Sequence, residues 1–209
     1  MKKELAGLFE NNKKWANRMA DQDPEFFQRL AKGQQPQYLW IGCSDSRVPA
    51  RQMTDARPGE VFVHLNIANL VHQNDLNVLS VLQFSVEVLK VRHIIVCGHY
   101  ACGGVKASME STDHGLVDNW IRPIKNIYER YKEELDGLND DEKVDRLCEW
   151  NVRQQVANVA QSTVLQKAWR QNQEISVHGI IYNLRNGKLV DLDCCLQSPA
   201  DVSTIYHVL

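Results

Sequence analysis

Apolar residues in this chain alternate between short continuous runs and longer stretches with helical spacing. The short runs at 37–42 and 93–97 predict buried strands, and the run at 61–67 predicts a further strand. Residues 75–90, which open with an Asp/Asn start signal, predict an amphipathic helix between the second and third strands. Because such a helical crossover makes its two strands parallel, their carboxyl ends are expected at one edge of the sheet.

The rest of the chain predicts helices at the start and an edge hairpin near the end. The first helix has Leu5, Leu8, Phe9, Trp15 and Met19 as its apolar positions, and a second opens at Asp23-Pro24. Ranges 116–135 and 141–172 predict helices without obvious chemistry, the second kinked at Ser162-Thr163. In 174–195, two strand-like runs are joined by Asn186-Gly187, which favours a tight antiparallel hairpin.

The predicted fold class is therefore α/β: a mostly parallel central β-sheet flanked by helices, with an antiparallel edge hairpin and an N-terminal helical arm. A length of 209 residues suits one domain, with 1–34 as the arm and 35–209 as the α/β core. No repeat, low-complexity tract or linker argues for a second domain.

Composition excludes several partners. A formal charge of −2 leaves no basic excess for nucleic acid, and no apolar run has the length of a membrane span. Residues 1–19 lack the apolar core of a secretory signal, so we expect a cytoplasmic protein whose six cysteines are reduced. Reduced cysteines in such a chain favour metal-binding or catalytic roles.

Two short clusters carry the candidate chemistry. CSDSR supplies Cys43 and Asp45, and CGHYACGG supplies His99 and Cys102; thiolate, carboxylate and imidazole are donors that a tetrahedral Zn²⁺ accepts. Each cluster follows a predicted strand, so both turns are expected at one sheet edge, where open α/β sheets bind ligands. The other cysteines and histidines are expected to pack rather than to bind metal, with Cys97 a minor candidate ligand: Cys97, Cys148, Cys194, Cys195, His64 and His93.

Arg47 decides whether this zinc would be structural or catalytic. Four protein ligands would close the site, whereas a catalytic zinc keeps one position open. From two residues further along, the Arg47 guanidinium is expected to bind the Asp45 carboxylate and keep it off the metal. Water could then bind, and zinc would lower its pKa toward neutrality, although two thiolate ligands weaken this effect, so activity should favour alkaline pH. Asp45 would return to the metal when hydroxide is scarce. A non-catalytic protein with zinc permanently closed by Asp45 is the alternative.

These clusters, with the runs YLW at 38–40 and PGEVFVHLNIANLV at 58–71, resemble the β-class carbonic anhydrases of bacterial type. The resemblance implies a zinc lyase that hydrates CO₂ reversibly to bicarbonate with a zinc-bound hydroxide. It implies Cys43, His99 and Cys102 as metal ligands and Asp45 with Arg47 as the dyad that controls access to the metal. The backbone near Gly103 would orient the substrate, and Phe62 and Phe84 are candidates to line the CO₂ pocket.

The resemblance also implies partners and one departure. Family members form homodimers and often dimer-of-dimers tetramers, with the N-terminal helix over the neighbouring subunit. A subgroup has a regulatory bicarbonate site, of which this chain matches Trp40 and Tyr182 but has Leu65 in place of an arginine. We therefore expect bicarbonate inhibition through that site to be weak or absent. A zinc hydrolase acting on CS₂ or COS remains an alternative activity, because the metal motif is the same.

Overall fold

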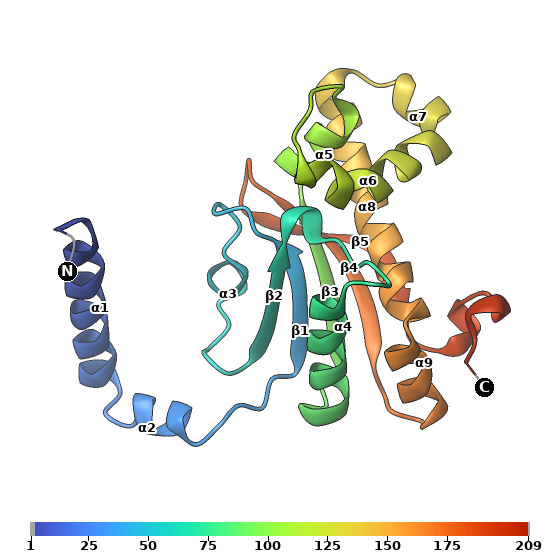
Figure 1. The fold of residues 1–209 in the computed structure, drawn as a ribbon. Helices are drawn as coiled ribbons and strands as arrows, with labels where there is room; N and C mark the ends of the chain where they lie inside the picture. The colour runs from blue at the N-terminus through green and yellow to red at the C-terminus, as the bar shows by residue number, and fades with distance from the viewer. Residues whose placement is uncertain (1–2, 209) are drawn as a thin grey trace. The chain divides into compact units, whose positions relative to one another are not determined.

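The computed structural model describes residues 3–208, and the predicted domain limits at Met1 and Leu209 lie outside them. Within the described residues, five strands form one sheet in the order β2-β1-β3-β4-β5 (Figure 1). The β1, β2, β3 and β4 strands are parallel, and β5 runs antiparallel to β4. The predicted fold class is confirmed. The strands are β1 Tyr38–Cys43, β2 Val61–Asn66, β3 His93–His99, β4 Ser176–Asn183 and β5 Lys188–Leu196.

The crossover helix α4 (Leu76–Gln83) connects β2 to β3 as predicted, and both strands flank β1. Asp75 caps α4 by accepting a hydrogen bond from the Asn77 backbone amide. The helix continues as a π-helical turn, Phe84–Val88. In the parallel register Cys43 lies beside Asn66, and β3 ends at His99. The turns after β1, β2 and β3 therefore share one edge of the sheet.

The predicted kink in 141–172 is a complete break between two helices. Ser162 adopts an extended conformation, and its hydroxyl accepts a hydrogen bond from the Leu165 amide, so it caps the next helix. The remaining helices after β1 are α3 Ala50–Met53, α5 Gly103–Met109, α6 Leu116–Arg130, α7 Lys132–Asp136, α8 Asp140–Gln161 and α9 Thr163–Arg170, with short 3₁₀ turns at Ile67–Asn69, Pro199–Asp201 and Thr204–Tyr206.

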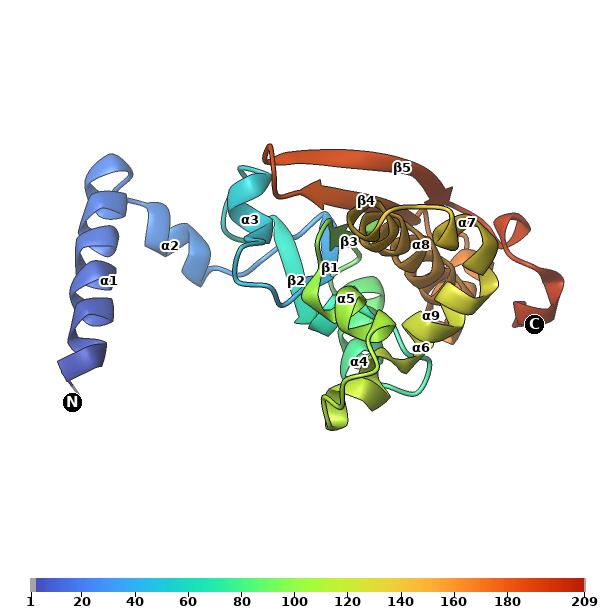
Figure 2. The same cartoon turned by 90° about the horizontal axis from the view of Figure 1, so that it is seen from above.

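Helices α4, α8 and α9 cover the same face of the sheet (Figure 2), and their apolar side chains form the main core with that face. Helix α8 packs closely against β3 and β4 because Gly98 and Gly179, which face Val152 of the helix, have no side chains. A Cβ atom at Gly98 would lie 2.6 Å from Val152 Cγ2, and one at Gly179 would lie 3.1 Å from Val152 Cγ1. On the other face, Trp40, Ala50, Val61 and Cys97 form a smaller cluster.

The edge hairpin is confirmed, but its turn differs from the prediction. Asn183 pairs with Lys188, so four residues form the turn. Within that turn Gly187 has a positive φ of 71°, whereas Asn186 does not. The reason is that the Asn183 carbonyl accepts the Gly187 amide at 2.8 Å, which closes a wider turn than a two-residue hairpin.

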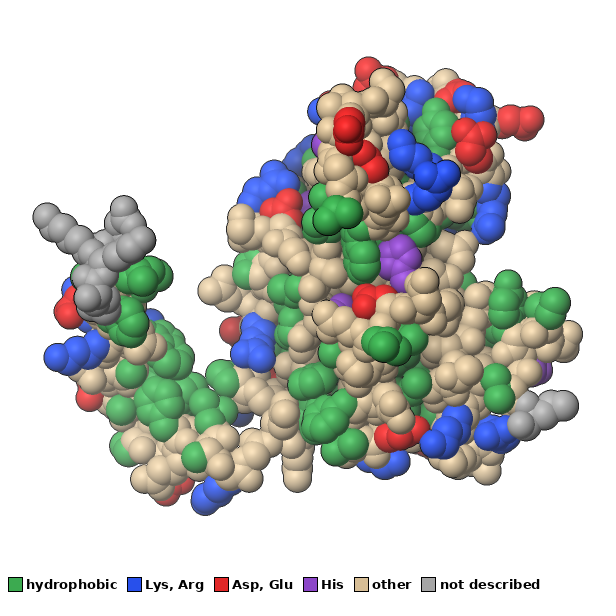
Figure 3. All heavy atoms as spheres, viewed as in Figure 1, with side chains coloured by type: hydrophobic (Ala, Val, Ile, Leu, Met, Phe, Trp, Pro, Cys, Tyr) green, Lys and Arg blue, Asp and Glu red, His purple; other side chains and the backbone are tan. Residues whose placement is uncertain are grey.

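The chain divides into two compact units, Met1–Gln35 and Pro36–Leu209, close to the predicted limit of the arm. The first contains α1 (Lys3–Gln22) and α2 (Phe26–Ala31), joined through edge-to-face contacts of Trp15 with the rings of Phe26 and Phe27. Leu8 and Phe9 are 65% and 60% exposed, and Figure 3 shows apolar side chains gathered along this unit. None of the helices in residues 3–208 is long and apolar enough to cross a membrane.

Candidate metal centre

Three of the four predicted ligands converge at the shared sheet edge. Cys43 ends β1, His99 ends β3, and Cys102 directly precedes α5. Their ligand atoms lie within 4.8 Å of one another, and the two sulfur atoms are 3.9 Å apart. All three side chains are buried. Two sulfurs and one imidazole nitrogen form a soft donor set that suits zinc.

The imidazole of His99 is oriented to offer one nitrogen to a metal. Its Nδ1 donates to the Tyr100 carbonyl oxygen at 2.9 Å, which leaves the lone pair on Nε2. Nε2 is buried and has no hydrogen-bond partner among the described residues. A buried polar atom without a partner is costly, and a metal ion at this position would remove that cost.

The cysteine pair has the electrostatics of a cation site. The pKa of Cys43 is lowered to about 4, first because the Cys102 thiol donates to its sulfur, and further through His99 and the backbone amides of Asp45 and Ala68. The pKa of Cys102 is raised because its proton is held by Cys43 and because it is buried. Without a metal the pair therefore shares one proton, and ionising both buried sulfurs would require a cation between them.

Asp45 stands beside the three ligands but is bound by Arg47. The Arg47 backbone amide and Nε donate to Asp45 Oδ1 at 3.0 and 2.9 Å, and its terminal nitrogen donates to Oδ2 at 2.7 Å. These bonds hold the pKa of Asp45 well below its usual range. Asp45 Oδ2 lies 3.6 Å from His99 Nε2. The structure thus has the paired contact expected from the D-x-R spacing, with the carboxylate next to the ligand cluster.

The predicted substrate residues are not all near this cluster. Gly103 follows Cys102 directly. Apart from the adjoining backbone, no described atom lies within 4 Å of the position that a Cβ atom of residue 103 would occupy, so the space beside it is open. The rings of Phe62 and Phe84 are 5.9 Å apart and form a pair. Phe62, however, lies four residues before Asn66 on β2, about 13 Å along the strand from the level of Cys43. Within a single chain Phe62 is therefore set back along the strand from Cys43, with Phe84 beside it.

The three residues expected at the altered bicarbonate site lie on or beside the small cluster of the second sheet face. Trp40 is buried and Tyr182 packs against that cluster, whereas Leu65 is 46% exposed. A Cβ atom at Gly42 would touch both Trp40 Nε1, at 2.6 Å, and Leu65 Cδ2, at 3.2 Å. Trp40 Nε1 has no hydrogen-bond partner in the described part of the chain. The indole of Trp40 and the aliphatic side chain of Leu65 therefore both lie beside Gly42.

The remaining cysteines lie mostly as expected. Cys97 is fully buried, outside the ligand group, and burial raises its pKa. Cys148 is also buried, and Cys194 is partly buried. Cys195 corrects the packing prediction because its side chain is exposed. The physical reason is that successive residues of the edge strand β5 point to opposite faces.

The expected core or edge positions of two histidines agree with the structure. His64 is buried within β2, and its Nε2 lies 3.3 Å from the Asn66 side-chain nitrogen. His93 is half-buried on β3 and stacks on the ring of Tyr38. Neither belongs to the Cys43, His99 and Cys102 group.

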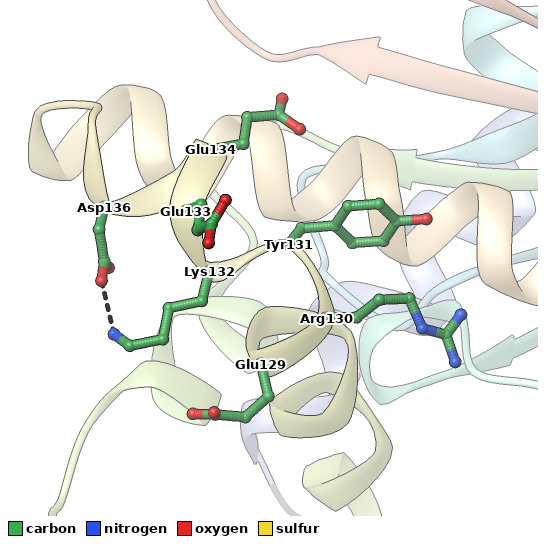
Figure 4. Close-up of a pocket in the computed structure, with 7 residues that line it drawn as sticks. All are labelled: Glu129, Arg130, Tyr131, Lys132, Glu133, Glu134 and Asp136. Atoms are coloured by element: carbon green, nitrogen blue, oxygen red, sulfur yellow. Dashed lines mark hydrogen bonds and ion pairs between the residues drawn. The ribbon is translucent and has the colours of Figure 1, made fainter.

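A separate hollow of about 690 Å³ lies where α6 meets α7 (Figure 4). Its lining side chains are mostly charged, and Lys132 forms an ion pair with Asp136 there. None of its lining residues belongs to the predicted site: Glu129, Arg130, Tyr131, Lys132, Glu133, Glu134 and Asp136. This hollow is therefore not part of the candidate metal centre.

The sequence of 141–172 carries no obvious chemistry, yet α8 contacts both turns of the candidate metal centre. Asp145 accepts the Ala101 amide, and Asn151 donates to the Ala68 carbonyl. No motif marks these residues. One feature of the sequence could have indicated their role. Asn151 and Gln155, four residues apart on α8, place polar amide side chains at buried positions where apolar residues are expected.

The fold and the converging sulfur and imidazole donors define a metal-binding α/β protein whose site lies at the carboxyl edge of a mostly parallel sheet. The sequence model of the carbonic anhydrase family matches residues 38–189. The chain therefore belongs to the β-class carbonic anhydrase family, in agreement with the resemblance noted in its motifs.

Individual relatives support this assignment along nearly the whole chain. A carbonic anhydrase from Emericella nidulans is 45% identical over 96% of this chain and 89% of its own length. A Coccomyxa β-carbonic anhydrase solved with acetazolamide has a TM-score of 0.91 at 41% identity and covers 94% of this chain and 90% of its own. A structure from work on two tetrameric β-carbonic anhydrases of Sordaria macrospora has a TM-score of 0.89 at 36% identity, covering 92% and 98%.

Proposed function

We propose that this protein catalyses the reversible hydration of CO₂ to bicarbonate and a proton, with zinc held by Cys43, His99 and Cys102. The observation that carries the proposal is the convergence of these ligands beside the Asp45–Arg47 pair, in a chain of the carbonic anhydrase family. When bound, zinc would lower the pKa of a water molecule toward neutrality and so supply the nucleophile for CO₂.

The chain's own residues have separable roles in this proposal. Cys43, His99 and Cys102 bind the ion, and the Tyr100 carbonyl fixes the imidazole that offers Nε2. Arg47 holds the Asp45 carboxylate through two guanidinium contacts, which leaves a position for water. Asp45 is the side chain that would close that position when the hold of Arg47 is lost, and pH would bias this switch. The proton released in the reaction leaves to solvent.

Self-association is part of the proposal. The Sordaria macrospora relatives are described as tetrameric. In this chain Leu8 and Phe9 on α1 are more than half exposed, as expected for a helix whose apolar side chains pack on another subunit. We infer a homodimer or a dimer-of-dimers tetramer, which light scattering after size-exclusion chromatography would test. A monomer at micromolar concentration would contradict this inference.

The activity is tested by stopped-flow CO₂ hydration from mildly acidic to alkaline pH on zinc-quantified protein. We expect turnover that rises with pH in the parent. Asp45→Asn should weaken the loss of activity at acid pH, because the amide is a poorer ligand than a carboxylate. Zinc-loaded protein without CO₂ hydration would reject the proposal, and an acid limb unchanged in Asp45→Asn would reject the switch.

The same preparation separates the alternatives. CS₂ and COS are assayed alongside CO₂, and turnover of either without CO₂ hydration would favour the related hydrolase. A structural zinc protein would tolerate Arg47→Ala without functional loss. The bidentate Arg47–Asp45 contact argues against permanent closure by Asp45, because it occupies both carboxylate oxygens.

A further inference from the structure

We propose that α8 positions the metal ligands through Asp145 and Asn151, which hold the two turns that carry or contact those ligands. Both are positioning residues, since neither side chain belongs to the ligand group. The inference rests on the proposed zinc function and extends it to a helix that is distant in sequence from Cys43 and His99.

The first turn links His99 to Cys102. Ala101 within it has a φ of 54°, a left-handed conformation that residues with a Cβ atom adopt at a cost. Its amide donates to Asp145 Oδ1 at 2.9 Å. The neighbouring Tyr100 hydroxyl donates to Glu149 Oε1 at 2.8 Å. Two acidic side chains one helical turn apart on α8 therefore fix the residues between two metal ligands.

The second turn follows β2 and lies beside the end of β1, where Cys43 pairs with Asn66. Ala68 and Asn69 both have left-handed φ angles, 60° and 49°. The Ala68 carbonyl accepts the Asn151 side chain at 3.0 Å. Asn151 is 1% exposed, so this contact is shielded from water. Holding the Ala68 carbonyl fixes the turn that lies beside Cys43.

The Asn151 side chain is itself held by a chain of amides along α8. Gln155 Nε2 donates to Asn151 Oδ1 at 2.9 Å, and Gln155 Oε1 accepts the Val71 amide at 2.9 Å. Asn158 donates to both Gln155 Oε1 and the Val71 carbonyl. Such a connected network has one low-energy arrangement, because each amide orientation is fixed by the next.

The Asn66 side chain spans the Ala68 turn through the amide and carbonyl of Leu70, and α8 adds a hold on both turns that their own backbone preferences do not supply. Without Asp145, Ala101 could relax from its left-handed conformation and change the separation of His99 and Cys102. Loss of contacts that orient metal ligands typically weakens metal affinity by about 10–100-fold. A purely structural role for Asp145 would change stability but not the affinity or spectrum of the bound metal.

Asp145 offers a matched set of variants in the full-length protein. Asp145→Ala removes the acceptor of the Ala101 amide, whereas Asp145→Asn keeps an oxygen there. Arg185→Ala removes only the ion pair that Arg185 makes with Asp145 Oδ2 at 3.2 Å. Zinc affinity is measured by competition with a chromophoric chelator, and Co²⁺-substituted protein is examined by thiolate-to-metal absorption. Urea unfolding of the metal-free forms reports stability separately.

We expect Asp145→Ala to weaken zinc binding about tenfold or more and to shift the Co²⁺ spectrum. Asp145→Asn and Arg185→Ala should stay within about threefold of the parent. Asn151→Ala should also weaken zinc binding, and if it fails to fold, the Asp145 set still decides the question. Parent-like zinc affinity and Co²⁺ spectrum in Asp145→Ala would overturn the inference, as would equal losses in all three Asp145 and Arg185 variants.

Failure of the proposed function has a different signature. A parent protein that binds one zinc tightly but does not hydrate CO₂ would reject the activity and leave the positioning role testable. A parent that hydrates CO₂, with Asp145→Ala unchanged in zinc affinity, would reject only the positioning role.

Discussion

Replacing Gly98 with alanine tests whether the close approach of α8 to the sheet determines stability. A Cβ atom at residue 98 would lie 2.6 Å from Val152 Cγ2, 3.2 Å from Ile181 Cδ1 and 3.4 Å from Asn69 Oδ1. Carbon atoms in contact prefer about 3.5–4.0 Å, so the closest contact is about 1 Å too short. Val152 and Ile181 are fully buried, and the surrounding core leaves little room for either to move.

Overpacking of this kind costs about 1–3 kcal/mol of unfolding free energy. For a chain of about 200 residues, each kcal/mol lowers the melting temperature by about 2–4 °C. We therefore expect Gly98→Ala to lower it by about 2–12 °C. Because Val152 follows Asn151 on α8, displacement of the helix should also weaken zinc binding through the Ala68 turn.

The assay is urea or thermal unfolding of four proteins: parent, Gly98→Ala, Val152→Ala and the double variant. Val152→Ala removes the methyl group that the new Cβ would strike, so the double variant should be more stable than the sum of the single losses predicts. Gly103→Ala is the matched control, because no described atom crowds its Cβ position. Unchanged stability of Gly98→Ala, or strictly additive losses, would refute the reasoning.

Further predictions concern the metal centre and its surroundings. Arg47→Ala should reduce kcat/KM for CO₂ by about 10–100-fold, most at acid pH, in stopped-flow assays; equal loss at every pH would contradict the gating role. The pKa of Asp45 in the folded protein is lower than its unfolded value of about 3.9, so the ionised carboxylate stabilises the fold above that pH and this stabilisation is lost on further acidification. Asp45→Asn should therefore flatten the acidic part of a curve of unfolding free energy against pH. A curve identical to that of the parent would contradict this prediction. Chelation of zinc should lower the melting temperature by about 8–16 °C if zinc is present at about 1,000 times its Kd, and no shift would argue against bound metal. With Leu65 beside Trp40, bicarbonate should not inhibit cooperatively, and cooperative inhibition together with a crystal structure showing the ion beside these two residues would overturn that expectation.

Local sequence patterns determined the strands and most helices of this protein. Apolar runs identify β1 and β3, which are buried inside the sheet, and also the edge strand β2, which is only partly buried. The Asp75 cap marks the start of α4. The parallel crossover then places the turns after β1 and β3 at one edge, so convergence of Cys43 with His99 followed from topology. The D-x-R spacing similarly fixed the Asp45–Arg47 contact, because it lies within one short turn.

Tertiary structure decided which distant side chains support that site. The left-handed conformations of Ala68 and Ala101 have no sequence signal, because alanine disfavours them and tertiary contacts, among them those from α8, compensate. The exposure of Cys195 and the wider turn at Gly187 likewise depend on edge-strand packing and on hydrogen bonds formed after pairing. Sequence determined the candidate ligands and the sheet edge because these follow from local periodicity. The contacts from α8 to the two turns join residues more than 40 positions apart, and only the packing of α8 on the sheet brings them together.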